Sequence, residues 1–390
     1  MASPPLTKAR HVLVQATTRA GGDLNPLVAL ALGLRAAGHE LTVLCDPPSE
    51  PLFARFGMKT VISGPEYEVG ATVKAALNNS QGKPNEQRAA IVAERVAEWA
   101  AQLAPSADKV LAVTRPDMLL TSFFGTCIGS QLHRMSGVPW IALNSTFYIG
   151  PNPPRPMSRD FSERAADVFR YSVIPYLAEA TLVLHATDPV FDYDLRGIPH
   201  NHRYTGPLFW EAPGVVPNYI YEQGGPWALC TLSSLKQDDT PIATATLSAL
   251  SHTRHRLAIT VGPGHAVEEV ASAPLPPNSH VEQYIPHSAI LERARLLISH
   301  AGHGSVMKSL LYGVPMVLVP WSRDQFGVAA RAESMGAALV VPKETLTTHV
   351  MAEAIDKVLN EPEYKWAAES SAMRLRNMHP LATALEMINF

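Results

Sequence analysis

The stretch LLISHAGHGS, residues 296–305, joins an apolar run to a glycine-rich turn that holds two histidines and ends in a serine. The apolar run Leu296–Ser299 predicts a buried strand, and the residues after the turn predict a helix. Glycine has no Cβ and accepts positive φ, so this turn can lie close to a ligand. The helix that follows offers unpaired N–H groups and a partial positive charge at its first turn. The pattern therefore predicts a seat for a diphosphate.

A second strand-and-loop unit follows the first. Val317–Pro320 is another apolar run, and the pair Asp324-Gln325 comes shortly after it. A carboxylate beside an amide is suited to hydrogen bonds with neighbouring hydroxyl groups, as on a sugar. A diphosphate seat next to such a pair points to a bound nucleotide sugar.

Composition excludes several classes of protein. The chain has 390 residues, of which 46% are hydrophobic and 17% charged, so it can form two domains with sizeable cores and is not expected to be disordered. The net charge is -3 without a basic cluster, which argues against a nucleic-acid partner. Cys45, Cys127 and Cys230 lie in apolar stretches without a CxxC pair and indicate buried thiols in a reducing compartment. The histidines show no metal-ligand spacing, so no metal site is expected.

The chain also lacks the usual membrane signals. Residues 1–10 contain no apolar segment of the kind found in secretory signals. No apolar run approaches the ~20 residues needed to span a bilayer. We therefore expect a cytoplasmic protein without integral membrane association.

Strands and helices alternate through most of the chain, which predicts an α/β fold with parallel sheets. A helix is expected between Asn25, a capping residue, and Gly38, and an amphipathic helix over Glu86–Leu103. The strands expected in the first half are His11–Gln15, Leu41–Cys45, Met118–Phe123 and Val138–Leu143. Those expected in the second half are Ala228–Leu232, Leu257–Val261, Leu296–Ser299, Val317–Val319 and Ala338–Val341.

The break between the two halves lies in Gly206–Pro226, which is rich in glycine, proline and aromatic residues and has no periodicity. We expect a first domain over residues 1–212, a linker over 213–224, a second domain over 225–372 and a helical tail over 373–390. The turns do not carry the dinucleotide fingerprint GxGxxG, since residues 19–23, 262–264 and 302–304 all lack the required glycines. An oxidoreductase is therefore disfavoured.

The stretch PPNSHVEQYIPH, residues 276–287, together with HAGHGS, residues 300–305, resembles the nucleotide-sugar-dependent glycosyltransferases of the GT-B fold (family 1, UDP-glycosyltransferase-like), in the style of bacterial natural-product enzymes. The resemblance covers nearly the whole chain and is weakest between Ser49 and Val110. It implies two Rossmann-like domains that face each other across a cleft, with the C-terminal helix packed back on the first domain. It also implies a monomer or homodimer, no cofactor, a UDP- or dTDP-sugar as donor, and metal-independent, inverting transfer to a hydroxyl, or a ring carbon, of a small apolar or phenolic acceptor.

The resemblance further implies roles for individual residues. His300 and Ser305 would contact the diphosphate. Tyr284 replaces a stacking tryptophan, and the backbone of Ile285 would bind the base. His287 would lie near the ribose. The expected donor-binding residues are Ser234, Tyr284, Ile285, His287, His300, Gly302, His303, Gly304, Ser305, Asp324 and Gln325.

Two departures from the family pattern stand out. Lys308 replaces a glutamate that usually bridges the ribose hydroxyls, and a lysine cannot accept hydrogen bonds from them, which leaves UDP and dTDP open and adds weight to dTDP. Asp23 replaces the usual histidine base, and Ser122 replaces its partner aspartate. A second carboxylate would raise the pKa of an aspartate base, whereas a hydroxyl can donate a hydrogen bond to it. Asp23 is thus the expected general base, with Ser122 as its neighbour.

Simpler interpretations stay open beside these. Asp23 and Asp324 each precede a helix and can act as caps, His303 can be a packed loop residue, and Lys308 can be exposed. The aromatic residues between Phe147 and Tyr176 suit either a core or an acceptor pocket. At the level of function, a nucleotide-sugar epimerase of the same fold and a non-catalytic donor-binding protein are the alternatives to a transferase.

Overall fold

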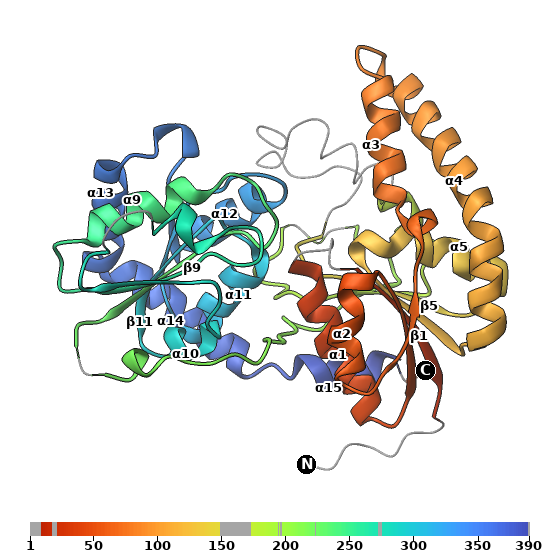
Figure 1. The fold of residues 1–390 in the computed structure, drawn as a ribbon, viewed down its shortest axis with the longest axis horizontal. Coiled ribbons are helices and arrows are strands. Elements are labelled where there is room, and N and C mark those ends of the chain that lie inside the picture. The colour runs from red at the N-terminus through yellow and green to blue at the C-terminus, as the bar shows by residue number, and fades with distance from the viewer. Residues whose placement is uncertain are drawn as a thin grey trace.

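The apolar runs that alternate with helices form two separate parallel sheets, which lie beside each other in Figure 1. The computed structural model describes residues 9–17, 22–148, 173–193, 195, 197–222, 224–271 and 275–388. The first sheet has the strand order β3-β2-β1-β4-β5-β6-β7, and the second has the order β10-β9-β8-β11-β12-β13. The strand pairs of both sheets are parallel. The expected two-domain α/β fold is confirmed.

The elements of the first domain have the following bounds. Its strands are β1 (His11–Ala16), β2 (Glu40–Cys45), β3 (Lys59–Ile62), β4 (Met118–Ser122), β5 (Trp140–Asn144), β6 (Leu182–His185) and β7 (His202–Tyr204). Its helices are α1 (Leu24–Ala36), α2 (Glu50–Ala54), α3 (Val69–Asn79), α4 (Asn85–Thr114), α5 (Thr126–Ser136) and α8 (Ile174–Leu177).

The second domain continues this alternation. Its strands are β8 (Trp227–Thr231), β9 (Arg256–Thr260), β10 (Ser279–Glu282), β11 (Ala294–Ser299), β12 (Met316–Leu318) and β13 (Ala338–Val340). Its helices are α9 (Thr240–Leu250), α10 (His287–Leu291), α11 (His303–Tyr312), α12 (Gln325–Ser334), α13 (Thr348–Asn360) and α14 (Pro362–Arg376), and α15 (Pro380–Ile388) follows. Single 3₁₀ turns lie at Pro47–Ser49, Pro65–Tyr67, Phe123–Gly125, Asn218–Ile220, Val267–Glu269 and Lys343–Thr345.

Helices cover both faces of each sheet because successive strand side chains point to opposite faces (Figure 1). In the first domain, Val12 of β1 packs with Leu27 of α1, whereas the neighbouring Leu13 packs in the cluster that contains Leu103 of α4. The same division places α9 and α13 on one face of the second sheet and α11 and α14 on the other. The three cysteines are free and buried in these layers, as expected.

The strands that the sequence did not predict are mainly short edge strands. β3 and β10 form one edge of each sheet, and β7 forms the other edge of the first. The strand β3 is at best half-buried, so it lacks the apolar run by which a central strand is found. β6 is fully buried but only four residues long, which is too short to stand out.

Helix α4 extends well past the predicted end at Leu103 and contains Pro105. Proline inside a helix removes one hydrogen bond and costs about 3 kcal/mol. The buried face of α4 continues on both sides of the proline, from Trp99 and Leu103 to Ala107 and Val110. Burial of this face offsets the cost, which propensity alone does not foresee.

The aromatic residues between Phe147 and Tyr176, for which the sequence allows either a core or an acceptor pocket, fall into two groups. Phe147 is fully buried, with its ring 5.3 Å from that of Tyr193, and Tyr176 packs on the same core. Both therefore belong to the core of the first domain. Phe161, Phe169 and Tyr171 lie outside the described residues.

The C-terminal helix α15 packs back on the first domain, as the resemblance implied (Figure 1). Ala384 and Ile388 are buried in the cluster that contains Leu27 of α1. The two helices lie so close that a Cβ at Gly33 would come within 2.4 Å of Leu381 Cδ1. Glycine at this position in α1 therefore makes room for the tail.

The loop after β6, Thr187–Tyr193, is held by three helices of the second domain. Arg374 of α14 donates from Nε and Nη2 to Asp188 Oδ2, at 3.0 and 2.5 Å. Arg331 of α12 donates to the carbonyl oxygen of Phe191 at 2.7 Å. Asp188 is completely buried, so its charge depends on the arginine for compensation.

Replacing Arg374 tests this contact. Arg374→Ala leaves the Asp188 carboxylate buried without its cation, and we expect the free energy of unfolding to fall by about 3 kcal/mol. The matched control is Arg376→Ala on the same helix, whose guanidinium donates only to the carbonyl of Leu311 at 3.1 Å. Urea denaturation of the two variants gives the comparison. Equal midpoints would show that the Asp188 contact does not stabilise the fold.

Candidate functional site

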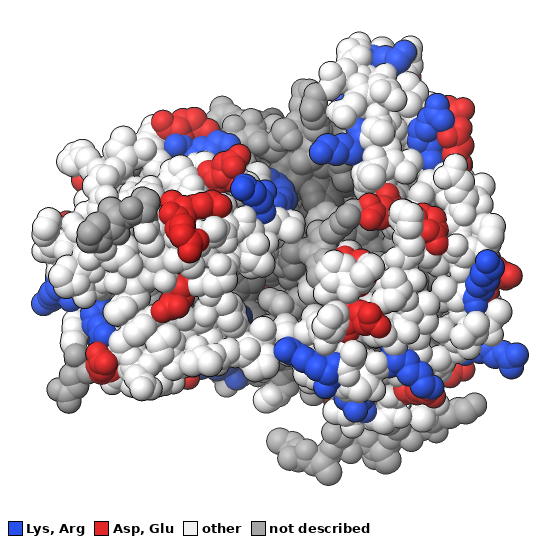
Figure 2. Space-filling model, viewed as in Figure 1, with Lys and Arg blue, Asp and Glu red and all other residues white. Residues whose placement is uncertain are grey.

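The carboxyl ends of the strands in the two sheets face one another across the boundary between the domains. The hydroxyl of Thr146, just after β5, donates to Asp324 Oδ2 at 2.7 Å, close to the start of α12. Thr187 Oγ1, after β6, lies 2.8 Å from His303 Nε2 at the start of α11. Figure 2 shows the surface hollowed between the two domains. Ligands of open α/β sheets bind at such strand ends, so this is the candidate site.

The glycine-rich turn between β11 and α11 places the imidazole of His300 over the start of the helix. His300 Nδ1 lies 3.5 Å from the carbonyl oxygen of Thr231, so Nδ1 carries the proton and donates to it. A Cβ at Gly302 would come within 2.6 Å of His300 Nε2. Gly302 is therefore required because the histidine ring occupies the space of a side chain.

The first turn of α11 has the properties of an anion seat. No side chain caps this turn, and it contains no acidic residue. Within the part of the chain that the structure describes, no side chain therefore compensates its N–H groups by capping. Gly304 is exposed and Ser305 is half-buried on this turn, next to His300. Ser234, in the loop after β8, is exposed as well.

His303 is a packed residue, which is one of the two roles that the sequence left open. Its Nε2 contacts Thr187, and its ring centroid lies 6.0 Å from that of Phe191 in the first domain. Burial lowers the pKa of His303 to about 4, which keeps the ring neutral. His303 thus joins the two domains, although it stands within the glycine-rich turn.

Asp324 and Gln325 make different contacts. Asp324 stands before α12 but makes no capping hydrogen bond, and its side chain reaches Thr146 of the first domain instead. Gln325 Oε1 accepts from the N–H groups of Trp321 and Ser322, both at 2.9 Å. Gln325 therefore fixes the turn that presents Asp324, whose role as a plain helix cap is not supported.

The carboxyl group of Asp23 lies at the same boundary. It is 8% exposed and makes no capping hydrogen bond to α1. The hydroxyl of Ser145 donates to Oδ1, whereas Oδ2 has no hydrogen-bond partner among the described residues. Burial raises the pKa of Asp23 well above its usual value, the charge of Asp324 raises it further, and the N–H of Phe124 opposes both. An unpartnered carboxyl oxygen with a raised pKa is suited to proton transfer.

The surroundings of this carboxyl differ from the expected ones in two respects. The neighbouring hydroxyl belongs to Ser145 and not to Ser122, whose buried Oγ has no hydrogen-bond partner in the described part of the chain. A second carboxylate does face Asp23, because Asp324 reaches it from the other domain. The sequence pattern placed Ser122 at a strand end correctly, but it carried no signal for a contact between two domains.

The residues expected near the nucleoside gather around the linker. Tyr284 donates from its hydroxyl to the carbonyl oxygen of Ala212 at 2.7 Å, and Ile285 is fully buried. The main-chain N–H of His287 donates to Glu211 Oε1 at 2.9 Å, and its Nε2 lies 3.0 Å from Thr260 Oγ1. The linker therefore lies against this side of the second domain.

Glu211 was missed by the sequence analysis. Its Oε1 lies 2.6 Å from Lys308 Nζ, and the two side chains are only 20% and 15% exposed. Lys308 is therefore not the exposed helix residue that one interpretation allowed. A single acidic residue in a segment without periodicity gives no sign of such a partner, because the pairing depends on how the linker folds back.

Two further features of the described residues bear on metal binding and on membrane association. Within these ranges no group of three or more histidine, cysteine, aspartate or glutamate side chains is placed to hold a metal ion. None of the helices found there is long and apolar enough to cross a bilayer.

Gly302→Ala tests the diphosphate seat. The added methyl group would displace the His300 ring, and we expect the affinity for uridine or thymidine diphosphate to fall by at least about tenfold, the value of one charge-assisted hydrogen bond. Gly70→Ala in α3 is the control, since a Cβ there meets no atom within 4 Å and the position lies outside the seat. Isothermal titration calorimetry measures both. Unchanged binding by the Gly302 variant would remove His300 from the seat.

Comparison with known proteins agrees with this geometry. Residues 244–383 match the family model of the erythromycin biosynthesis protein CIII-like C-terminal domain. The chain is 25% identical to 4'-demethylrebeccamycin synthase of Lentzea aerocolonigenes, over 96% of this chain and 97% of that protein. It is 22% identical to NDP-glycosyltransferase YjiC of Bacillus subtilis (strain 168), over 88% and 87% of the two chains.

Solved structures share the fold along the full length. The calicheamicin glycosyltransferase CalG4 superposes with a TM-score of 0.74 at 18% identity, over 98% of this chain and 97% of that one. The spinosyn rhamnosyltransferase SpnG complexed with thymidine diphosphate gives 0.73 at 18% identity, over 97% and 100%. The chain therefore has the GT-B fold, and it is similar to natural-product glycosyltransferases both in the matched domain family and in the relatives that align along almost its whole length.

Proposed function

We propose that this glycosyltransferase moves a sugar from a UDP- or dTDP-sugar to a hydroxyl group of a small apolar or phenolic acceptor, with inversion at the anomeric carbon. An acidic ring carbon is the second class of acceptor atom. The observation that carries the proposal is the Asp23 carboxyl, which is buried at the domain boundary with one oxygen that has no hydrogen-bond partner among the described residues. The first domain, residues 1–212, would bind the acceptor, and the second, residues 225–372, would bind the donor.

The donor side of the reaction rests on the turn before α11. The diphosphate would lie at the uncapped helix start, next to His300 and Ser305. The relative SpnG, which shares this fold, was solved with thymidine diphosphate, in keeping with such a donor. As the bond between the anomeric carbon and the diphosphate oxygen breaks, the imidazole and the helix N–H groups would stabilise the charge on the leaving group. Asp324 would hold hydroxyl groups of the sugar.

The acceptor side rests on Asp23. Its free oxygen, Oδ2, would take the proton from the acceptor hydroxyl while that oxygen attacks the anomeric carbon. Attack from the face opposite the diphosphate inverts the configuration. The raised pKa of Asp23 makes its carboxylate a stronger base than an exposed aspartate. A phenol suits this base better than an alkanol because its proton is easier to remove.

Asp23→Asn tests the base. We expect kcat to fall by roughly 10²–10⁴-fold, the usual contribution of general base catalysis, with donor affinity unchanged. The assay is mass spectrometry of products formed from UDP-glucose or dTDP-glucose and a panel of phenolic and polyketide acceptors. Ser122→Ala, which removes a hydroxyl that contacts nothing polar in the described residues, should change kcat little.

The outcomes of this screen separate the alternatives. A hexose mass shift in the acceptor supports transfer, whereas a changed donor sugar without any acceptor supports an epimerase. Tight nucleotide binding without either product supports a non-catalytic donor-binding protein. Transfer that survives Asp23→Asn removes Asp23 as the base and leaves the transferase assignment intact.

The pH dependence tests the pairing of the two carboxyl groups. Asp23 accepts a proton only when ionised, so kcat/KM should rise with pH through its raised pKa. Asp324→Asn removes one of the causes that raise this pKa, and the rising limb should move to lower pH even though the rate falls. Asp108→Asn, at an exposed position on α4, is the control. A limb that stays in place would show that Asp324 does not act on the ionisation of Asp23.

A further inference from the structure

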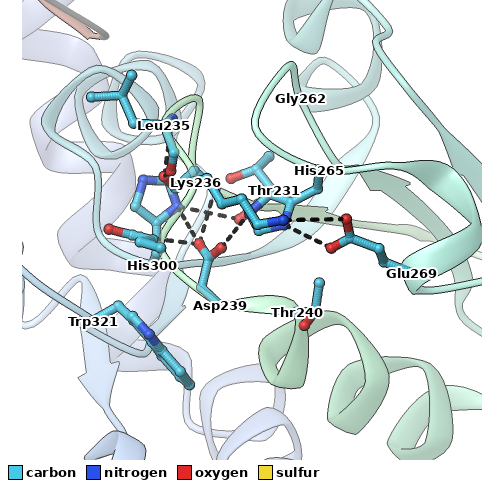
Figure 3. A network of polar contacts seen from close by, with 12 residues as sticks. Thr231, Leu235, Lys236, Asp239, Thr240, Gly262, His265, Glu269, His300 and Trp321 are labelled. Carbon is cyan, nitrogen blue, oxygen red and sulfur yellow. Dashed lines mark hydrogen bonds and ion pairs between the residues drawn. The ribbon is translucent and has the colours of Figure 1, made fainter. Parts of the chain in front are cut away.

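A buried carboxylate, Asp239, lies behind His300 and has no part in the mechanism above. Asp239 stands just before α9 and is completely buried. Its Oδ2 accepts from the N–H of Ser233 at 3.0 Å and from Gln237 Nε2 at 3.1 Å. The same oxygen lies 3.9 Å from His300 Nδ1, and Oδ1 lies 2.7 Å from His265 Nε2 (Figure 3). The carboxylate thus stands between two imidazoles.

His265 is held in turn by a second carboxylate. Its side chain is fully buried in the turn after β9. His265 Nδ1 lies 3.3 Å from Glu269 Oε2, so each ring nitrogen faces a carboxylate oxygen (Figure 3). His265 is therefore in direct contact with Asp239 on one side and with Glu269 on the other. The chain of contacts runs from the surface residue Glu269 through His265 and Asp239 to His300.

The backbone is strained at both ends of the contact between Asp239 and His300. Asp238 has φ of 58° and Ala301 has φ of 65°, which are left-handed values that non-glycine residues rarely adopt. For Ala301 in particular, the left-handed conformation opposes folding. Burial of an ionised carboxylate adds a further cost, even when it is hydrogen-bonded. Strained backbone is common at functional sites, where the surrounding structure holds the strained residues in place.

The tautomer of His300 indicates what the Asp239 carboxylate does in the site. Nδ1 faces two acceptors, the Thr231 carbonyl oxygen and Asp239, so it carries a proton. In the neutral ring Nε2 then has a lone pair, which repels a phosphate oxygen. His300 can donate from Nε2 to a diphosphate only as an imidazolium, with both nitrogens protonated.

The groups around His300 act in opposite directions on its charge. Burial lowers the pKa of His300, and the charges of Arg323 and His265 lower it as well. The Asp239 carboxylate raises this pKa, as does the hydrogen bond to Thr231. The buried ring of His287 also faces His300. Asp239 is thus the only carboxylate among these neighbours, and it favours the charged ring.

We propose that Asp239, anchored by His265, is a positioning residue that allows His300 to bind the donor diphosphate as an imidazolium. The inference rests on the diphosphate seat of the proposed function and adds the group that supplies its charge. Binding of the diphosphate would then be accompanied by uptake of one proton, which stays on His300 Nε2 between the ring and the phosphate oxygen.

The test compares ligands that do and do not carry phosphate. Asp239→Asn keeps the size of the side chain and removes its charge. We expect the affinity for uridine or thymidine diphosphate to fall by about tenfold or more, while the affinity for the parent nucleoside is unchanged. Calorimetry in buffers of different ionisation enthalpy should show proton uptake on diphosphate binding by the wild type and its loss in the variant.

The matched control is Asp238→Asn at the exposed neighbouring position. Asparagine accepts the left-handed backbone as well as aspartate does, so binding and proton uptake should stay at the wild-type level. If Asp239→Asn does not fold, His265→Gln is the second variant, and it should weaken diphosphate binding in the same selective way because Asp239 loses its anchor.

Three outcomes would overturn the proposal. One is a variant that binds the diphosphate with wild-type affinity and proton uptake. Another is an equal loss of nucleoside and diphosphate binding, which would indicate a purely structural role. The third is a wild-type protein that binds no diphosphate. Diphosphate binding with proton uptake but without sugar transfer would leave this inference standing and remove the proposed transfer reaction.

Discussion

Two carboxyl groups from different domains meet at the centre of this molecule, and two adjacent residues hold them. Ser145 donates to Asp23, and Thr146 donates to Asp324. Both hydroxyls come from the segment that follows β5, so a single turn of the first domain orders groups that are proposed to act on the acceptor and on the sugar. The position of the second domain therefore enters the chemistry directly, because it decides how strongly Asp324 raises the pKa of Asp23.

This dependence explains which parts of the site could be predicted from the sequence. Gly302 and His300 belong to one local unit of strand, turn and helix, and local patterns of glycine and apolar residues are visible in a sequence. The neighbour of Asp23 is a different matter. Ser122 and Ser145 follow neighbouring strands, and only the packing of the loops decides which hydroxyl reaches the carboxylate. For the same reason the fold was predicted well in its central strands and poorly at the short edges β3, β7 and β10.

The ion pair between Glu211 and Lys308 is a second contact that could not be predicted from the sequence. Lys308 departs from the family pattern, and the sequence offered no reason for a cation at that position. In the structure it pairs with Glu211, whose other contacts are the N–H of His287 and the hydroxyl of Ser288. A carboxylate therefore remains on this side of the second domain, although it comes from the linker instead of the helix. An ion pair between residues that lie far apart in the chain cannot be predicted from the local sequence around either of them.

The candidate site also contains buried carboxyl groups and left-handed backbone, both of which oppose folding. Burial raises the pKa of both Asp23 and Asp324, so each binds a proton more tightly in the folded state than in the unfolded chain. Their effect on stability is thus most favourable below the usual pKa of an aspartate and is lost as the pH rises through the raised values. At neutral pH these two carboxyls weaken the fold, as does the left-handed backbone at Ala301 and Arg323. The layered cores of the two domains and the ion pair between Arg374 and Asp188 offset these costs, so the cleft can keep charged groups where binding and proton transfer need them.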